Sequence, residues 1–172
     1  MTPFSNSPDH LPEITAATKR LERSIMLAAG DFALILACCN SPQTQQQILN
    51  VLTASSTLKI KDIILKPTEV TLYKTIKNNI GTVHPEVVMI RGLESVVAIN
   101  QLITSTNIMR DEFRKTFHFP VVLWLNDEIL HKLIWLAPDL KNWSANTIRF
   151  DLPHNQLIDH CPFADFHLRK RN

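Results

Sequence analysis

Glycine is scarce in this chain, with only three in 172 residues, at Gly30, Gly81 and Gly92. Loops that wrap a phosphate group usually contain several glycines, because glycine lets the backbone approach the phosphate closely. None of the three lies in the turn after the first apolar run of strand length, 32–39, and no lysine lies there either. The sequence therefore excludes a standard phosphate-binding loop at the position where one is expected.

Cysteines, net charge and long apolar runs are also limited. The three cysteines are an odd number and two of them, Cys38 and Cys39, are adjacent in an apolar run, which favours reduced thiols in a cytoplasmic protein. The net charge is only +2, so neither a membrane nor a nucleic-acid partner is expected. No apolar run approaches the about 18 residues that a membrane-spanning helix needs. The polar, proline-bearing segment 1–12 does not resemble a signal peptide.

The composition is that of an ordinary globular domain, with 45% hydrophobic and 20% charged residues. A chain of this length can bury a sizeable core in one domain. We expect residues 1–30 to form a leader and an N-terminal helix, 31–152 an α/β domain, and 153–172 a C-terminal tail.

Short apolar runs alternate with segments of helical spacing about five times, which predicts an α/β fold. Apolar runs without alternation are typical of parallel strands covered on both faces by helices. We therefore expect a three-layer sandwich with a mainly parallel five-stranded sheet. The predicted strands are 32–39, 60–65, 87–90, 120–125 and 148–152. The predicted helices are 12–29, one that starts at Pro42, 67–80, 95–117 with an interruption near 104–107, and 127–137.

The strand 87–90 ends at the edge of the sheet where open α/β folds bind ligands. In nucleotide hydrolases this position holds the carboxylate that binds Mg²⁺ or its water shell, but here it is Arg91. A cation repels magnesium, so we expect Arg91 to pair with Glu94, with Asp127 or with a carbonyl group. Glu94 itself is better suited to the start of the following helix, where a negative charge is favourable.

The turn after the strand 32–39 contains Asn40, Ser41 and Pro42. Ser41 is a suitable N-cap and Pro42 a suitable first residue of a helix that carries Ile48, Val51 and Leu52 inward. Its four glutamines should face mostly outward. If a nucleotide binds at all, the residues that would hold it are Asn40, Ser41, Thr44, Arg91 and Glu94. The alternative interpretation is a plain strand-to-helix turn capped by Ser41.

No other group of residues predicts a catalytic or metal site. The histidines of the tail and Cys161 match no zinc spacing, and Cys38 and Cys39 are better explained by packing in the core. The tail also carries Phe163 and Phe166, which need an apolar surface on this domain or on a partner. The tryptophans are expected in the core or at an interface; they are Trp124, Trp135 and Trp143.

Several segments together resemble one family: 32–42, 91–94, 120–125 and 137–140 followed by Trp143. The chain resembles the degenerate P-loop NTPase-like domain at the front of bacterial, especially cyanobacterial, STAND-type and tetratricopeptide-repeat signalling proteins. The segment 87–94 also resembles the Walker B strand of true STAND ATPases, with Arg91 at the position of the first acid. The arginine usual after the tryptophan-led segment is absent, since Ala145 and Asn146 follow Ser144.

The resemblance implies a P-loop-like fold that acts as a regulatory or protein-interaction module. The leading hypothesis is a non-catalytic NTPase-like domain of a bacterial signalling or conflict system, whose partner is another protein, an adjoining domain or a second copy of the chain. It predicts no cofactor. The alternative is a nucleotide-binding switch with an altered phosphate loop. A metal-dependent enzyme would need clustered acids at strand ends, which the sequence lacks.

Overall fold

The computed structural model describes residues 11–145 and 147–150, with side chains from Ile14 onward. They form an α/β fold around a sheet of five parallel strands in the order β2-β3-β4-β1-β5, which confirms the predicted fold class. Each of the predicted strands is present within the described residues. The strands are β1 (Ala33–Cys38), β2 (Ile60–Ile64), β3 (Val87–Arg91), β4 (Pro120–Leu125) and β5 (Ile148–Arg149).

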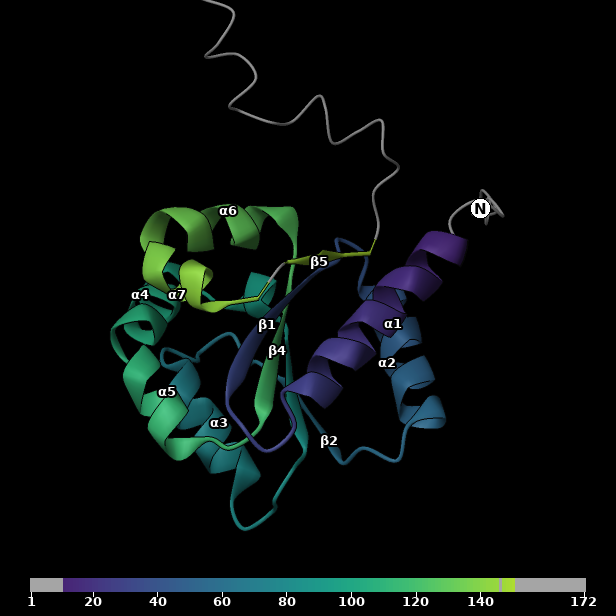
Figure 1. Cartoon of the computed structure of the whole chain (residues 1–172). Coiled ribbons are helices and arrows are strands. Elements are labelled where there is room, and N and C mark those ends of the chain that lie inside the picture. Colours follow the sequence, from purple (N-terminus) through teal and green to yellow (C-terminus); the bar gives the residue numbers. More distant parts are fainter. Residues whose placement is uncertain (1–10, 146, 151–172) are drawn as a thin grey trace, which may run out of the picture.

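Helices cover both faces of the sheet (Figure 1). One face is covered by α1 (Leu11–Leu27) and α2 (Pro42–Ser55). The other face is covered by α3 (Leu72–Ile80), α4 (Ile99–Ile108), α5 (Arg110–Thr116), α6 (Asp127–Leu136) and α7 (Pro138–Trp143), with a short 3₁₀ helix, η1 (Leu93–Ser95), after β3.

Alternate residues of each strand supply two separate cores, because successive side chains of a strand point to opposite faces. In β1, Leu34 and Leu36 pack toward α3–α7, whereas Ile35 and Ala37 pack toward α1 and α2. All six residues of β4 are buried. This two-sided burial explains why the strands are continuous apolar runs in the sequence.

The connections after β1 and β4 leave the sheet on opposite faces. The strands β1 and β4 are neighbours, with Cys38 paired to Leu125 at their carboxyl ends. The chain leaves β1 into α2 on one face and leaves β4 into α6 on the other. In open α/β sheets, ligands bind at such a divergence. The fold therefore places its candidate site at the carboxyl ends of β1 and β4.

The predicted start of the third helix, at 67, is wrong. The α3 helix begins at Leu72, and Pro67 and Thr68 lie in a turn. The carbonyl of Pro67 accepts a hydrogen bond from the backbone of Val97, 3.0 Å away, and so is used outside any helix. Tertiary contacts thus override the local start signal.

The other differences concern helix breaks and helix faces. The break between α4 and α5 falls at Met109 rather than at 104–107, and α7 was not predicted. Val51 was expected to face inward, but its exposed fraction is 54%. Val51 instead lines the groove between α1 and α2. Among the described residues, no helix is both long and apolar enough to cross a bilayer. The tail 153–172 lies outside the described residues.

Candidate functional site

Asn40 and Asp127 close the space between the carboxyl ends of β1 and β4. The Asn40 side chain donates from Nδ2 to Oδ2 of Asp127, 2.9 Å away. Its Oδ1 accepts the backbone N–H of Asp127, also at 2.9 Å. Both ends of the Asn40 amide are therefore engaged with the first residue of α6. The β1–α2 turn and the start of α6 are therefore hydrogen-bonded to one another at the place where a ligand would enter.

A second oxygen of Asp127 extends this cluster to β5. Oδ1 of Asp127 accepts a hydrogen bond from the Arg149 guanidinium at 2.8 Å and one from the Cys38 thiol at 3.4 Å. Cys38 and Arg149 are paired in the register of β1 and β5. The residues Asn40, Asp127, Arg149 and Cys38 are called the switch-point cluster below. The cluster joins three strand ends through one carboxylate.

Opposing effects act on the pKa of Asp127. Burial raises it, whereas the hydrogen bonds from Asn40, Arg149 and Cys38 and the charge of Arg149 lower it, and the net pKa lies below the usual 3.8. The ionised carboxylate is the form that the cluster stabilises. Because this carboxylate is paired with the Arg149 guanidinium, the charges of the two groups cancel, and Arg149 is already engaged by a carboxylate where a nucleotide phosphate would need a cation.

The lowered pKa of Asp127 predicts a pH-dependent contribution to stability. A carboxyl whose pKa is lower in the folded state stabilises the fold above its unfolded pKa, and this stabilisation is lost as the pH falls through the folded pKa. We expect Asp127→Asn to be less stable than the parent at pH 7 by about 1 kcal/mol, a value reduced because the side chain is half exposed. The difference should shrink below pH 3.8. Urea unfolding at both pH values measures it, and a difference independent of pH would contradict this assignment.

The start of α2 is capped by its own residues, as the sequence predicts. Oγ of Ser41 accepts the backbone N–H of Thr44 at 3.2 Å, and Pro42 occupies the first helical position. One glutamine departs from the expected outward orientation: Gln45 is buried, and its Nε2 donates to the carbonyl of Cys39 at 3.0 Å. Polar groups of the β1–α2 turn are thus hydrogen-bonded within the turn and the helix.

Arg91 forms the predicted ion pair, but with a different partner. Its Nε donates to Oδ1 of Asp62 at 2.9 Å and NH2 reaches the other carboxylate oxygen, which makes the pair bidentate. NH1 also donates to Gln46 of α2 at 3.0 Å. The expected partners Glu94 and Asp127 are therefore wrong. Because Ile64 is the register partner of Arg91 and Met89 that of Asp62, the guanidinium reaches back along the neighbouring strand.

The structure brings only some of the five predicted nucleotide-binding residues together. Asn40, Ser41 and Thr44 share the β1–α2 turn, and Arg91 reaches α2 through Gln46. Glu94 is exposed in η1, and none of the described residues forms a hydrogen bond or an ion pair with its side chain. The five residues therefore lie in three places: the β1–α2 turn, the end of β3 and η1.

Two charged residues of the sheet, Asp62 and Arg149, were not predicted from the sequence, although each forms an ion pair there. Asp62 is a single carboxylate within an apolar strand, which is a signal for a buried or half-buried partner. Arg149 lies beside Ile148 in a short edge strand and gives no comparable signal. Within 11–145 and 147–150, no group of three or more histidine, cysteine, aspartate or glutamate residues is placed to hold a metal ion.

A cationic stack covers the tryptophan of α7. The guanidinium of Arg114 lies 4.4 Å from the centre of the Trp143 ring, and that of Arg110 lies 5.8 Å from it. Arg110 is also 3.8 Å from Asp139. Two arginines of α5 thus pack against the tryptophan of α7.

Two comparisons, with protein-family models and with curated proteins, give no match for this chain.

Proposed function

We propose that this chain is a non-catalytic, NTPase-like regulatory or protein-interaction domain, and that it acts in a bacterial signalling or conflict system. The observation that carries the first part is the switch-point cluster. Asn40, the residue that follows the β1–β4 pairing, has both ends of its amide engaged with Asp127. A nucleotide phosphate at this position would have to break these two hydrogen bonds and approach a carboxylate.

Two further features support a domain without phosphoryl transfer. That reaction depends almost wholly on positioning and on cations that neutralise the developing charge. The turn after β1 contains no lysine, and the arginine at the end of β3 is already neutralised by Asp62. A cation that could stabilise the transition state is therefore absent from the turn after β1, and the cation at the end of β3 is already paired with a carboxylate.

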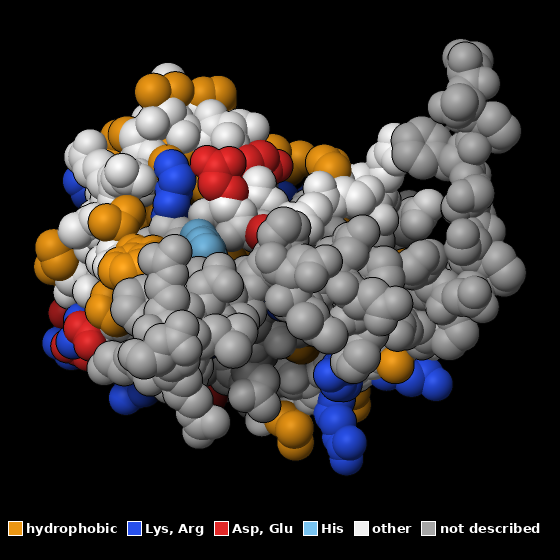
Figure 2. All heavy atoms as spheres, turned by 90° about the horizontal axis from the view of Figure 1, so that it is seen from above, with side chains coloured by type: hydrophobic (Ala, Val, Ile, Leu, Met, Phe, Trp, Pro, Cys, Tyr) orange, Lys and Arg blue, Asp and Glu red, His pale blue; other side chains and the backbone are white. Residues whose placement is uncertain are grey.

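Exposed apolar residues at the end of α6 support an interaction role. Trp135 is 81% exposed, and its neighbours Ile134 and Leu136 are also at the surface. Figure 2 shows hydrophobic side chains beside acidic and basic ones on this face. Tryptophan is enriched among the residues that dominate binding energy at protein interfaces. The signalling context comes from the resemblance of the sequence segments described above.

We expect no Mg²⁺-dependent hydrolysis of ATP or GTP above background, and no heat of binding in isothermal titration with either nucleotide. The Glu94→Ala and Asn40→Ala variants should be equally inactive. Turnover by the parent chain that disappears in either variant would contradict the proposal. Saturable binding without turnover would instead favour the alternative, a nucleotide-binding switch around Asn40, Ser41 and Thr44.

A further inference from the structure

The strand β2 lies at one edge of the sheet and pairs only with β3 among the described strands. The carbonyl of Lys59 accepts the backbone N–H of Glu86 at 2.9 Å, and the N–H of Leu65 donates to the carbonyl of Arg91 at 2.9 Å. Because the backbone groups of successive residues in a strand point to alternate sides, every second residue of β2 directs its N–H and C=O away from β3. These residues are Ile60, Asp62 and Ile64.

The outward backbone groups of β2 have no partner in the described part of the chain. No backbone or side-chain hydrogen bond within residues 11–145 and 147–150 reaches those of Ile60, Asp62 or Ile64. A row of unpaired N–H and C=O groups is a template for another extended strand. Domains that recognise peptides by strand addition use such an edge for affinity and the alternating side chains for specificity.

The two faces beside this edge differ in chemistry. On the α2 face, Ile64 is 65% exposed and Ile60 is half-buried. Asp62 lies on the same face, but its charge is balanced by Arg91. On the opposite face lie Lys59, which is exposed, and Lys61, which is half-buried. The edge is therefore apolar on one side and positive on the other.

We propose that the edge of β2 binds an extended segment of a protein partner in which acidic residues alternate with apolar ones. A strand added to this edge places its alternate side chains on opposite faces of the sheet. Its acidic residues would lie beside Lys59 and Lys61, and its apolar residues beside Ile60 and Ile64. This assignment names the partner class for the proposed interaction function and rests on that function.

Lysines along an edge strand disfavour pairing of that edge with a second copy of itself. An antiparallel pair of β2 strands that sets Ile60 opposite Ile64 of the copy makes the two Lys61 side chains diagonal neighbours, which repel one another. An acidic segment converts the same lysines into favourable contacts. Charge complementarity therefore selects an acidic partner over self-association.

The test uses the full chain and a fluorescein-labelled, end-capped peptide of alternating glutamate and valine. We expect saturable binding by fluorescence anisotropy and slower hydrogen exchange of the outward amides, those of Ile60, Asp62 and Ile64. Lys61→Glu should weaken binding by about tenfold or more. Ile64→Pro should abolish it, because it removes an outward N–H that the fold itself does not use. A peptide with lysine in place of glutamate should not bind.

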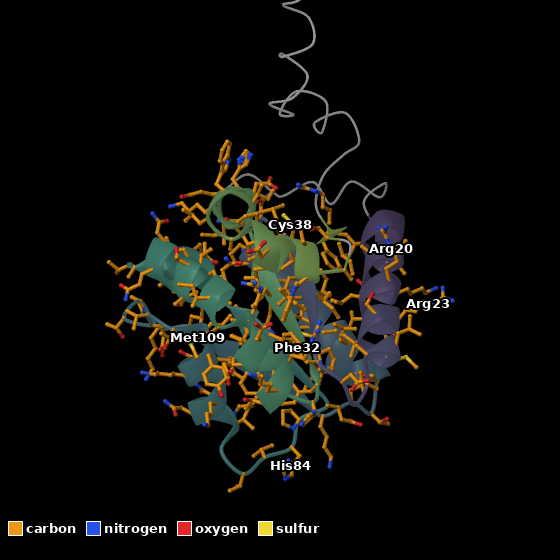
Figure 3. All side chains as sticks on the ribbon, turned by 60° about the vertical axis from the view of Figure 1, so that its left-hand side comes forward. Arg20, Arg23, Phe32, Cys38, His84 and Met109 are labelled. Atoms are coloured by element: carbon orange, nitrogen blue, oxygen red, sulfur yellow. The ribbon has the colours of Figure 1, made fainter. Side chains whose placement is uncertain are left out.

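The matched control is Arg23→Glu, which makes the same change in net charge on the exposed face of α1 (Figure 3). It should bind the peptide as the parent does. Absence of binding up to about 1 mM peptide, the affinity of a very weak contact, would overturn the proposal. So would equal weakening by Lys61→Glu and Arg23→Glu, or a dimer in solution that Ile64→Pro dissociates. Nucleotide hydrolysis would instead overturn the proposed function and leave the peptide result standing.

Discussion

Replacing Trp124 by alanine is expected to lower the free energy of unfolding by about 3–5 kcal/mol, the usual cost of removing a large buried aromatic side chain. Trp124 is in β4, between β1 and β3, and is 0% exposed. Its ring centre lies 5.3 Å from that of Phe150, just after β5. The alanine variant would leave a cavity between β4 and the helices α1 and α2. The same strand leads to Asp127.

The indole of Trp124 also provides a sharper comparison. Its Nε1–H is buried and has no hydrogen-bond partner among the described residues. A buried donor without a partner costs about 1–3 kcal/mol. Trp124→Phe removes that donor and keeps an aromatic ring, so it should lose less than half of what Trp124→Ala loses. Urea unfolding of the three proteins measures both changes. Equal losses for Phe and Ala would show that the ring contributes little and would contradict this view of the core.

Much of the sheet could be predicted because its strands are buried on both faces. Such strands are continuous apolar runs, and the bounds predicted for 120–125 agree with those of β4. Helix starts marked by side-chain caps were also predictable. Serine and asparagine are favoured at N-caps, and Ser41 and Asn126 accept the backbone N–H groups of Thr44 and Ile129, respectively.

The misplaced elements depend on tertiary contacts that no local pattern encodes. The segment 67–69 has a proline followed by two polar residues, which is a helix start signal, yet the carbonyl of Pro67 accepts a hydrogen bond from the distant Val97. The short α7 helix depends on Asn107 of α4, whose Oδ1 accepts the N–H of Leu140 at 2.9 Å. Both contacts join segments about thirty residues apart and become visible only in the fold.

The candidate site was predictable in position but not in composition. The carboxyl edge of the sheet follows from parallel strands alone, and Asn40 follows from the first strand end. The pairing of Asp127 with both Asn40 and Arg149 depends on strand order, which places β1 between β4 and β5. The sequence gives the residues that follow each strand, but it does not give which strand ends are neighbours. For the same reason Arg91 was assigned the wrong partner.

The ion pair of Arg91 and Asp62 links β3, β2 and α2, and Arg91→Met is expected to lower the free energy of unfolding by about 1–3 kcal/mol. The exposed fractions of the two side chains are 14% and 28%, so the pair is only partly screened by solvent. Removal of the guanidinium leaves the carboxylate of Asp62 without its bidentate donor. Because that carboxylate still reaches water, the loss should stay below the 3–5 kcal/mol that follows when a fully buried pair is broken.

A double-mutant cycle with Asp62→Asn separates the pair from other effects of each substitution. If the interaction stabilises the edge of the sheet, Asp62→Asn should cost much less in the Arg91→Met background than in the parent, with a coupling energy of about 1 kcal/mol or more. Urea unfolding of the four proteins gives this value. The matched control is Lys115→Met, which removes an exposed cation paired with Glu112 on α5 and should change stability little. A coupling energy near zero would mean that Arg91 stabilises the fold through Gln46 and packing rather than through Asp62.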